Sequence, residues 1–332
     1  MPLPSGCSRV LPCALALLAA CQSLAAGAVG AATDPPQGPV VFLQPSKDGG
    51  DAEDVQPWAE ELPPDAFSEY PSDPYCAADD FYWQVAPTGL IYRSYLAGPH
   101  EPRTSITPFF SSNRALWDAT VGGRGGVLRY GNNDPLHPQG YQLDVYGAAI
   151  VRLDAENDQD LESTDYVFGF PLTYGIGDWQ FKFGYAHLSS HLGDELAIRD
   201  PNALDDRVNY VRDSLVFGTS RYPYPIWRLY GEAGWAFNNS GGADPWEFQF
   251  GNEVSRPGPT GLSGTPFLAV NGRMREELNY GGDLTAQSGW LWRGINGQSF
   301  RLGAHYYNGK ASQFQFYRRS EEQIGLGLWY DF

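Results

Sequence analysis

The sequence has little of what a helical membrane protein or a nucleic-acid-binding protein requires. Beyond the N-terminus, no uninterrupted apolar run approaches the roughly 18 residues that a membrane-spanning helix needs. The 332 residues include only 22 basic side chains against 39 acidic ones, which gives a formal net charge of −17. A nucleic-acid-binding surface needs basic side chains to neutralise phosphates. The composition therefore excludes a bundle of membrane helices and argues against nucleic acid as a partner.

Cysteine is also scarce. Of the four cysteines, Cys7 and Cys13 lie in the N-terminal stretch that we predict is removed, so at most Cys21 and Cys76 remain. Two cysteines cannot build the disulfide framework of a small secreted domain. The chain is instead rich in glycine (39 residues), tyrosine (20), phenylalanine (18) and tryptophan (10). Because aromatic side chains are enriched in strands, the composition favours β structure.

The N-terminus has the layout of an export signal. Arg9 precedes an apolar core at residues 11–20, and small residues follow. We therefore predict a signal peptide over residues 1–28. Two interpretations of its end stay open. The four residues that end at Cys21 resemble a lipobox, which would lipidate that cysteine, whereas the small residues up to Ala28 suit ordinary signal peptidase.

Residues 29–80 are acidic and rich in proline. Between residues 33 and 80 there are twelve acids and one base, Lys47. Such a segment cannot bury enough apolar surface to offset the entropy that ordering costs. We predict a disordered periplasmic arm, whose simplest role is that of a solvated spacer. A tail that binds a partner is the alternative, although nothing in the sequence identifies that partner.

From about residue 86 onward, apolar and polar residues alternate. The last strand shows this most clearly, because every second residue from Ile324 to Phe332 is aliphatic or aromatic. A membrane barrel needs this alternation, with apolar side chains outside and polar ones inside. A strand of this kind that ends on an aromatic residue resembles the C-terminal signature of bacterial outer-membrane β-barrels. The resemblance implies an outer-membrane location, in a Gram-negative-type envelope, and recognition of this strand by the barrel assembly machinery.

We predict an all-β, transmembrane antiparallel barrel of about twelve strands over residues 81–332, with ten strands as the alternative. A soluble sandwich would show the same alternation, but the export signal and the terminal Phe332 favour the barrel. The predicted strands lie near residues 88–97, 121–131, 139–153, 162–175, 178–191, 207–220, 226–238, 246–254, 266–274, 278–292, 298–308 and 320–332. Short turns at 175–177, 222–225 and 294–297 fall at one end, and longer acidic loops at 154–161 and 192–206 fall at the other.

The predicted lumen contains both signs of charge. The side chains are Asp144, Arg152, Lys182, Arg228, Glu232, Glu247, Asp283 and Arg301. A selective pore would favour one sign, whereas buried charges of both signs must be paired. A salt-bridged polar plug and a selective pore both stay open, and the balance of signs favours the plug. His305 is also predicted inside the lumen, paired with a carboxylate.

One predicted strand, 178–191, places polar side chains on its lipid-facing side. A period of two puts His187 and Ser189 on the same face as Phe181 and Phe183, and puts Lys182 in the lumen. Residues two apart on a strand are separated by about 6.5–7 Å, so the histidine can serve the serine as a general base.

A third polar group is needed to fix the tautomer of the histidine. If residue 191 faces residue 207 on the next strand, Ser189 lies opposite Asn209. Asn209 has the same parity as Val211 and Leu215, so it also points outward. The sequence therefore predicts a lipid-facing triad of His187, Ser189 and Asn209.

A His-x-Ser pair with an Asn on the next strand resembles outer-membrane phospholipase A, and it is also similar to the smaller lipid A deacylase barrels. The resemblance implies a twelve-stranded barrel whose site cleaves acyl esters of membrane lipid. It also implies a calcium cofactor and a homodimer, and Asp194 and Glu195 are the nearby candidate metal ligands. Those families have Asn directly after the serine, where this chain has Ser190, which leaves the assignment open.

Two stretches, GLIYRSYLAGP at residues 89–99 and HLSSHLGDE at residues 187–195, resemble an uncharacterised family of bacterial barrel proteins, a domain of unknown function. This resemblance spans about residues 80–332 and implies no known activity. Two hypotheses stay open. In one, the protein is a lipid-facing serine hydrolase that cleaves acyl esters of phospholipid or lipid A. In the other, it is a non-enzymatic barrel with a structural, surface-binding or narrow-pore role.

Overall fold

A computed structural model describes residues 81–134 and 136–332. The predicted signal peptide (residues 1–28) and acidic arm (residues 29–80) lie outside the described residues, and so do all four cysteines. The two interpretations of Cys21 therefore stay predictions.

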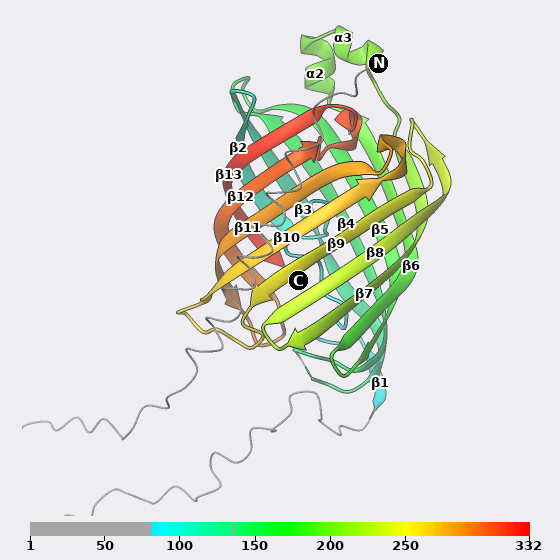
Figure 1. The fold of residues 1–332 in the computed structure, drawn as a ribbon, viewed down its shortest axis with the longest axis vertical. Helices are drawn as coiled ribbons and strands as arrows, with labels where there is room; N and C mark the ends of the chain where they lie inside the picture. The colour runs from blue at the N-terminus through cyan, green and yellow to red at the C-terminus, as the bar shows by residue number, and fades with distance from the viewer. Residues whose placement is uncertain (1–80, 135) are drawn as a thin grey trace, which may run out of the picture. The chain divides into compact units, whose positions relative to one another are not determined.

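Within the described residues, thirteen strands form one antiparallel sheet that closes into a barrel (Figure 1). Each strand from β2 to β13 pairs with the next one along the chain, and β13 pairs back with β2, for example Leu328 with Ile106. These twelve strands are the wall, and β1 is a short extra strand beside the end of β3. The bounds are β1 Tyr82–Val85, β2 Thr104–Ser111, β3 Arg114–Gly131, β4 Gly140–Asp154, β5 Asp160–Ile176, β6 Trp179–Leu192, β7 Val211–Tyr224, β8 Trp227–Ser240, β9 Trp246–Ser255, β10 Thr265–Arg275, β11 Gly281–Arg293, β12 Ser299–Lys310 and β13 Ser320–Asp331. The prediction of an all-β barrel of twelve antiparallel strands is confirmed.

The two ends of the barrel differ in the length of their connections. Two short helices, α2 (Asp194–Arg199) and α3 (Asn202–Asp205), join β6 to β7 at what we call the helical end, uppermost in Figure 1. Two single 3-10 turns, η1 (Glu276–Leu278) and η2 (Phe314–Phe316), lie in other connections at that end. At the opposite end, β5 reaches β6, and β7 reaches β8, through two residues each. The predicted turns at 175–177, 222–225 and 294–297 lie at this opposite end, and the predicted loops at 154–161 and 192–206 lie at the helical end. The connections at 132–139 and 256–264 are also long, however, and they lie at the end of the short turns. Among the described residues, no helix is long and apolar enough to cross a membrane.

The outer face of the barrel is apolar and its lumen is polar. Phe183 and Phe217 lie opposite each other on β6 and β7, and each is 52% exposed. In contrast, the guanidinium-bearing side chains of Arg129, Arg275 and Arg301 are completely enclosed. A soluble protein has the reverse distribution. The exposed apolar belt therefore indicates a barrel that spans a membrane.

One predicted strand was wrong, and one strand of the wall was not predicted, nor was the short β1. Residues 88–97 form no strand; they belong to residues 86–103, which leave the wall after β1 and lie inside the barrel. We call residues 86–103 the inner segment. Its apolar side chains, such as Ile91 and Tyr95, are completely buried, so their alternation reflects burial in the lumen and not contact with lipid. The missed strand, β2, takes this place in the wall, and the predicted number of strands was right because the two errors cancel.

Arginines of the wall hold the irregular backbone of the inner segment. Arg129 of β3 donates to the carbonyl of Gly89 at 2.9 Å. Arg228 of β8 donates to the carbonyl of Arg93 at 2.9 Å, and Arg301 of β12 donates to that of Leu96 at 3.0 Å. Buried backbone without regular structure needs such partners. The inner segment is thus a fixed part of the lumen.

All eight predicted lumen charges form ion pairs. The ion pairs that include predicted lumen residues are Arg124–Asp144, Arg152–Asp118, Arg152–Glu321, Lys182–Glu232, Arg212–Glu247, Arg228–Glu253, Arg273–Asp283 and Arg301–Asp331. This is the arrangement of a salt-bridged plug. His305 also lies in the lumen, but its ring nitrogens contact the amides of Gln287 and Gln323, so its predicted carboxylate partner was wrong.

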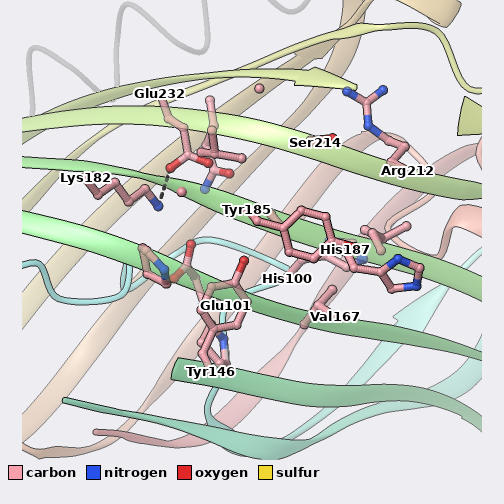
Figure 2. Close-up of a pocket in the computed structure, with 18 of the residues that line it drawn as sticks. His100, Glu101, Tyr146, Val167, Lys182, Tyr185, His187, Arg212, Ser214 and Glu232 are labelled. Atoms are coloured by element: carbon pink, nitrogen blue, oxygen red, sulfur yellow. Dashed lines mark ion pairs between the residues drawn. The ribbon is translucent and has the colours of Figure 1, made fainter. Parts of the chain in front are cut away.

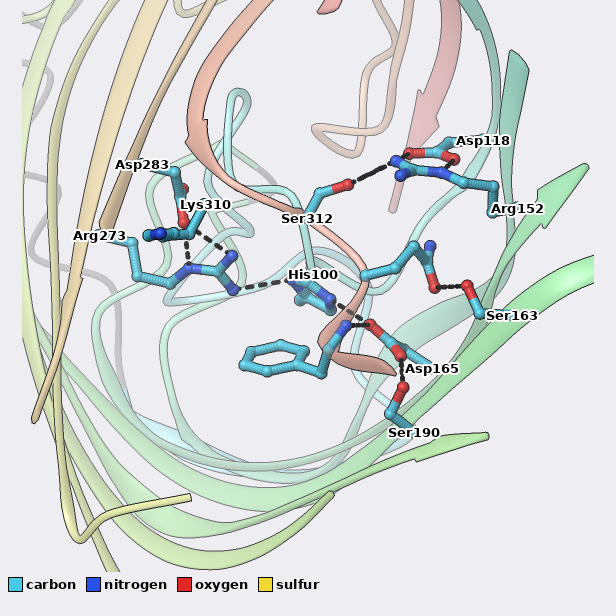
Figure 3. A network of polar contacts seen from close by, with 12 residues as sticks. His100, Asp118, Arg152, Ser163, Asp165, Ser190, Arg273, Asp283, Lys310 and Ser312 are labelled. Atoms are coloured by element: carbon cyan, nitrogen blue, oxygen red, sulfur yellow. Dashed lines mark hydrogen bonds and ion pairs between the residues drawn. The ribbon is translucent and has the colours of Figure 1, made fainter. Parts of the chain in front are cut away.

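A polar network joins the inner segment to the wall and to the connection between β12 and β13 (Figure 3). His100 of the inner segment contacts Asp165 of β5 through Nε2 at 2.9 Å and Arg273 of β10 through Nδ1 at 3.0 Å. The backbone N–H of Phe314 donates to the same Asp165 carboxylate at 3.1 Å. The inner segment and the connection between β12 and β13, which are far apart in sequence, therefore both lie in the lumen and both contact the Asp165 carboxylate.

Candidate active site on the outer face of the barrel

The outward face of β6 is occupied by His187 and Ser189, as the alternation predicts. The imidazole of His187 stacks on Phe168 of β5, with ring centroids 4.7 Å apart and an interplanar angle of 28°. Phe168 is itself an exposed outer residue. Ser189 lies opposite Tyr166, another exposed aromatic residue of β5. Lys182 points the other way and pairs with Glu232 in the lumen.

The register between β6 and β7 differs from the predicted one by two residues. Ser189 lies opposite Val211, not opposite Asn209. Asn209 precedes the first residue of β7, and its carbonyl accepts a hydrogen bond from Ser240 Oγ. The register depends on the long connection between the two strands, whose fold the sequence alone did not reveal. The predicted position of Asn209 beside the pair was therefore wrong.

The residue that lies opposite His187 is Asp213. The two side chains are hydrogen-bonded, with His187 Nδ1 and Asp213 Oδ1 2.7 Å apart. The sequence does contain a signal for Asp213, because it alternates with the outward residues Val211, Leu215 and Phe217. A carboxylate on an apolar lipid-facing row is unusual enough to mark a candidate site.

Two further donors reach the same carboxylate. Tyr185 Oη donates to Asp213 Oδ1 at 2.6 Å, and Asn238 Nδ2 donates to Asp213 Oδ2 at 2.7 Å. The side chains of His187 and Asp213 are only 20% and 17% exposed. Ionised groups that are largely removed from water need partners of this kind. The outer face thus contains a carboxylate that is in contact with a histidine and has hydrogen-bond partners on both of its oxygens.

The arrangement is that of a general base next to a hydroxyl. Because Nδ1 of His187 contacts Asp213, Nε2 is the ring nitrogen that remains to accept a proton. Ser189 lies two residues further along the same outward face, and within the described residues its hydroxyl makes no hydrogen bond. Nucleophile–base contacts are often loose before substrate binds.

The adjacent serine lies in a different environment. Ser190 faces the lumen, is 1% exposed, and donates to the buried carboxylate of Asp165. A cavity of about 130 Å³ also borders this part of the wall (Figure 2). Its lining includes Lys182, Glu232 and the inner-segment residue Glu101, and also Tyr185 and His187 of β6.

Asp194 and Glu195, the candidate metal ligands, lie in the first turn of α2. One carboxylate oxygen of Glu195 accepts a hydrogen bond from the backbone N–H of Leu161 at 3.2 Å. In the part of the chain that the structure describes, no group of three or more His, Cys, Asp or Glu side chains could hold a metal ion. These residues do not form a calcium site by themselves, and no step of the chemistry below depends on one.

Family models match residues 133–332, more than half of the chain, to the family described as Protein of unknown function (DUF1207). The chain belongs to the DUF1207 family. No curated protein matches this DUF1207 member.

Solved structures resemble this DUF1207 barrel at low sequence identity. Outer membrane phospholipase A from Escherichia coli is 12% identical, with a TM-score of 0.45, and the match covers 69% of this chain and 93% of that chain. The Salmonella typhi outer membrane phospholipase dimer with bound calcium is also 12% identical, with a TM-score of 0.43 and coverages of 69% and 91%. An anion-selective porin from Comamonas acidovorans is 9% identical, with a TM-score of 0.30 and coverages of 69% and 97%. At such identities and scores the likeness concerns the strand architecture alone.

Proposed function

We propose that this DUF1207 protein is an outer-membrane serine hydrolase that cleaves acyl esters of phospholipid or lipid A at the lipid-facing wall of the barrel. Ser189 is the nucleophile, His187 is the general base, and Asp213, rather than Asn209, orients the histidine. The observation that supports the proposal most strongly is the 2.7 Å contact between His187 Nδ1 and Asp213 Oδ1 on the outer face.

Charged side chains are unusual on the lipid-facing side of a barrel wall. A basic side chain there destabilises the barrel by about 2–4 kcal/mol at the membrane midplane and by about 0–1 kcal/mol near the interface, and Asp213 is the third residue of β7, near the end of the strand. An apolar pair such as Phe183 and Phe217, which lies further from the helical end on the same strands, can face lipid without that cost. A histidine, a carboxylate and a free serine hydroxyl together are the groups that nucleophilic acyl transfer requires.

The chemistry follows from the positions of the three side chains. Ser189 Oγ attacks the carbonyl carbon of the ester while His187 Nε2 takes the hydroxyl proton. The C–O bond of the ester then breaks, and the alcohol leaves with that proton from the imidazolium. Water adds to the acyl-enzyme by the same route, which releases the fatty acid and restores Ser189. Asp213 keeps Nδ1 of His187 protonated and stabilises the imidazolium that forms in each half.

The site opens sideways toward lipid, so the substrate class is a membrane lipid and not a solute that crosses the barrel. The paired charges and the inner segment fill the lumen, which gives no support to a narrow pore. A homodimer, insertion by the assembly machinery through the C-terminal strand, and a periplasmic location of the arm also belong to the proposal. So does a calcium requirement, for which Asp194 and Glu195 alone do not supply the ligands.

The test is acyl release by the refolded barrel. Phospholipid vesicles and lipid A would be incubated with the parent and with Ser189→Ala, each with and without calcium. We expect release by the parent and loss of at least about 10³-fold of the rate in the variant. Both proteins should show the same heat-modifiable band on a gel.

Ser190→Ala is the matched control, because it removes the neighbouring hydroxyl on the lumen side. It should keep the parent rate if it folds. Equal rates for the parent and Ser189→Ala, or no release by a folded parent, would leave the non-enzymatic structural or surface-binding barrel as the function.

A further inference from the structure

We infer that Tyr185 and Asn238 are positioning residues, which influence the reaction through Asp213. The inference rests on the proposed function, because it concerns the same site. It starts from the observation that the carboxylate of Asp213 has more partners than the orientation of a histidine alone requires.

Tyr185 and His187 bind the same oxygen. They lie two residues apart on β6, so their side chains leave the same face of the sheet. Tyr185 Oη donates to Asp213 Oδ1 at 2.6 Å, and His187 Nδ1 meets that oxygen at 2.7 Å. The phenol ring packs against Phe168 and Phe237, with centroid distances of 5.9 and 6.3 Å. These rings fix where the hydroxyl can lie.

Asn238 reaches the carboxylate because of a β-bulge. In the ladder between β7 and β8, Asp213 pairs with Asn238 while Ser214 pairs with Ala236, so Phe237 is the extra residue. Bulges re-aim side chains, and they are common next to active sites. Here the bulge places Asn238 beside Asp213, where its Nδ2 donates to Oδ2 at 2.7 Å.

Together the two donors fix the plane of the carboxylate. Asp213 accepts hydrogen bonds on both oxygens, so it cannot rotate about χ2 without breaking one of them. Oδ1 therefore stays aimed at His187. The donors also replace water that a carboxylate would otherwise bind, which a lipid-facing wall does not supply. Within the described residues, neither Tyr185 nor Asn238 is hydrogen-bonded to Ser189 or His187. Their effect on the reaction must therefore pass through Asp213.

A double-mutant cycle tests this route. Tyr185→Phe and Asn238→Ala would each be made in the parent and in Asp213→Ala. In the parent, each change should lower kcat about tenfold and leave KM unchanged, because a hydrogen bond to a charged group is lost. In Asp213→Ala, neither change should lower kcat further, because the group through which they act is gone.

The rate at which a fluorophosphonate labels Ser189 gives a second readout that needs no turnover, so the slow Asp213→Ala background stays measurable. Tyr174→Phe is the matched control, since Tyr174 is an outward tyrosine of β5 that stacks on Tyr141 far from the site. It should change neither readout.

The outcomes separate the inference from the proposed function. Equal losses in the parent and in Asp213→Ala, or no loss in either, would overturn the positioning role while a Ser189-dependent activity stands. A parent that neither hydrolyses lipid nor reacts with the label would overturn both.

Discussion

At the scale of single residues, the unusual feature of this barrel is a carboxylate on its apolar outer face. Asp213 lies in a row of apolar side chains, and its carboxylate is held by His187, Tyr185 and Asn238. His187 and Tyr185 come from β6 and Asn238 comes from β8, the two strands that pair with β7, where Asp213 lies. The carboxylate can therefore remain ionised beside lipid because the sheet supplies its hydrogen bonds.

Substitutions at Asp213 should rank by how many of these hydrogen bonds they keep. Asp213→Asn keeps an oxygen for His187 and Tyr185, and Asn238 can rotate its amide to accept from the new NH2 group. Asp213→Ala keeps none. We expect kcat to fall about tenfold in the first variant and about 10²–10³-fold in the second. Steady-state rates on phospholipid vesicles measure this, and equal rates in the two variants would contradict the orienting role.

The outward positions of His187 and Ser189 could be predicted from the sequence, but the contact of Asp213 with His187 could not. The parity of one strand is enough to place two residues on the same face, because it depends only on the alternation within that strand. The partner on the next strand depends on register, and register here depends on the helices α2 and α3 between β6 and β7. An error of two residues keeps the face but changes the neighbour. Val211 and not Asn209 lies opposite Ser189, and Asp213 lies opposite His187.

At the scale of elements, the inner segment shows that an alternating pattern reveals which side chains are buried but not whether the segment lies in the wall or in the lumen. Leu90, Tyr92 and Leu96 are buried in the lumen, although their pattern predicts a wall strand. Apolar side chains are favoured both where a segment is buried in the lumen and where a strand faces lipid, so the two cases give the same pattern. The other eleven wall strands were predictable because a turn or loop interrupts the alternation at each end of a strand. The route of a chain through the lumen leaves no such signal.

Removal of the inner segment should convert the plug into a channel. A chain without residues 81–102 keeps all twelve wall strands, since β2 begins at Thr104. A twelve-stranded barrel without a filling segment has room for water in its lumen. In planar bilayers we expect the deletion to raise the single-channel conductance well above that of the parent. An equally high conductance in the parent would show that the inner segment does not close the barrel.

At the scale of the whole barrel, the account depends on which face meets lipid. The wall exposes aromatic and aliphatic side chains all round, while the arginines and carboxylates lie inside in pairs. That distribution assigns the outer face to hydrocarbon and explains why Asp213, His187 and Ser189 stand out on it.

A charge placed on the middle of the outer face should therefore be costly. Phe217 lies near the middle of β7 and is 52% exposed. Phe217→Lys should lower the free energy of unfolding in phospholipid vesicles by about 2–4 kcal/mol, as expected for a basic side chain near the membrane midplane. Guanidinium titration of reversible folding measures it, with Phe217→Leu as the control. An unchanged midpoint for the lysine variant would place this face in water.

The central claim is that Ser189 is a nucleophile on the lipid-facing wall, and covalent labelling tests it most directly. The folded protein in phospholipid vesicles would be treated with a fluorophosphonate, and the modified residue would be located by mass spectrometry of its peptides. The account predicts an adduct on Ser189 that is lost in His187→Ala and that does not form on the lumen-facing Ser190. An adduct on Ser190, or no adduct on a folded parent, would contradict it.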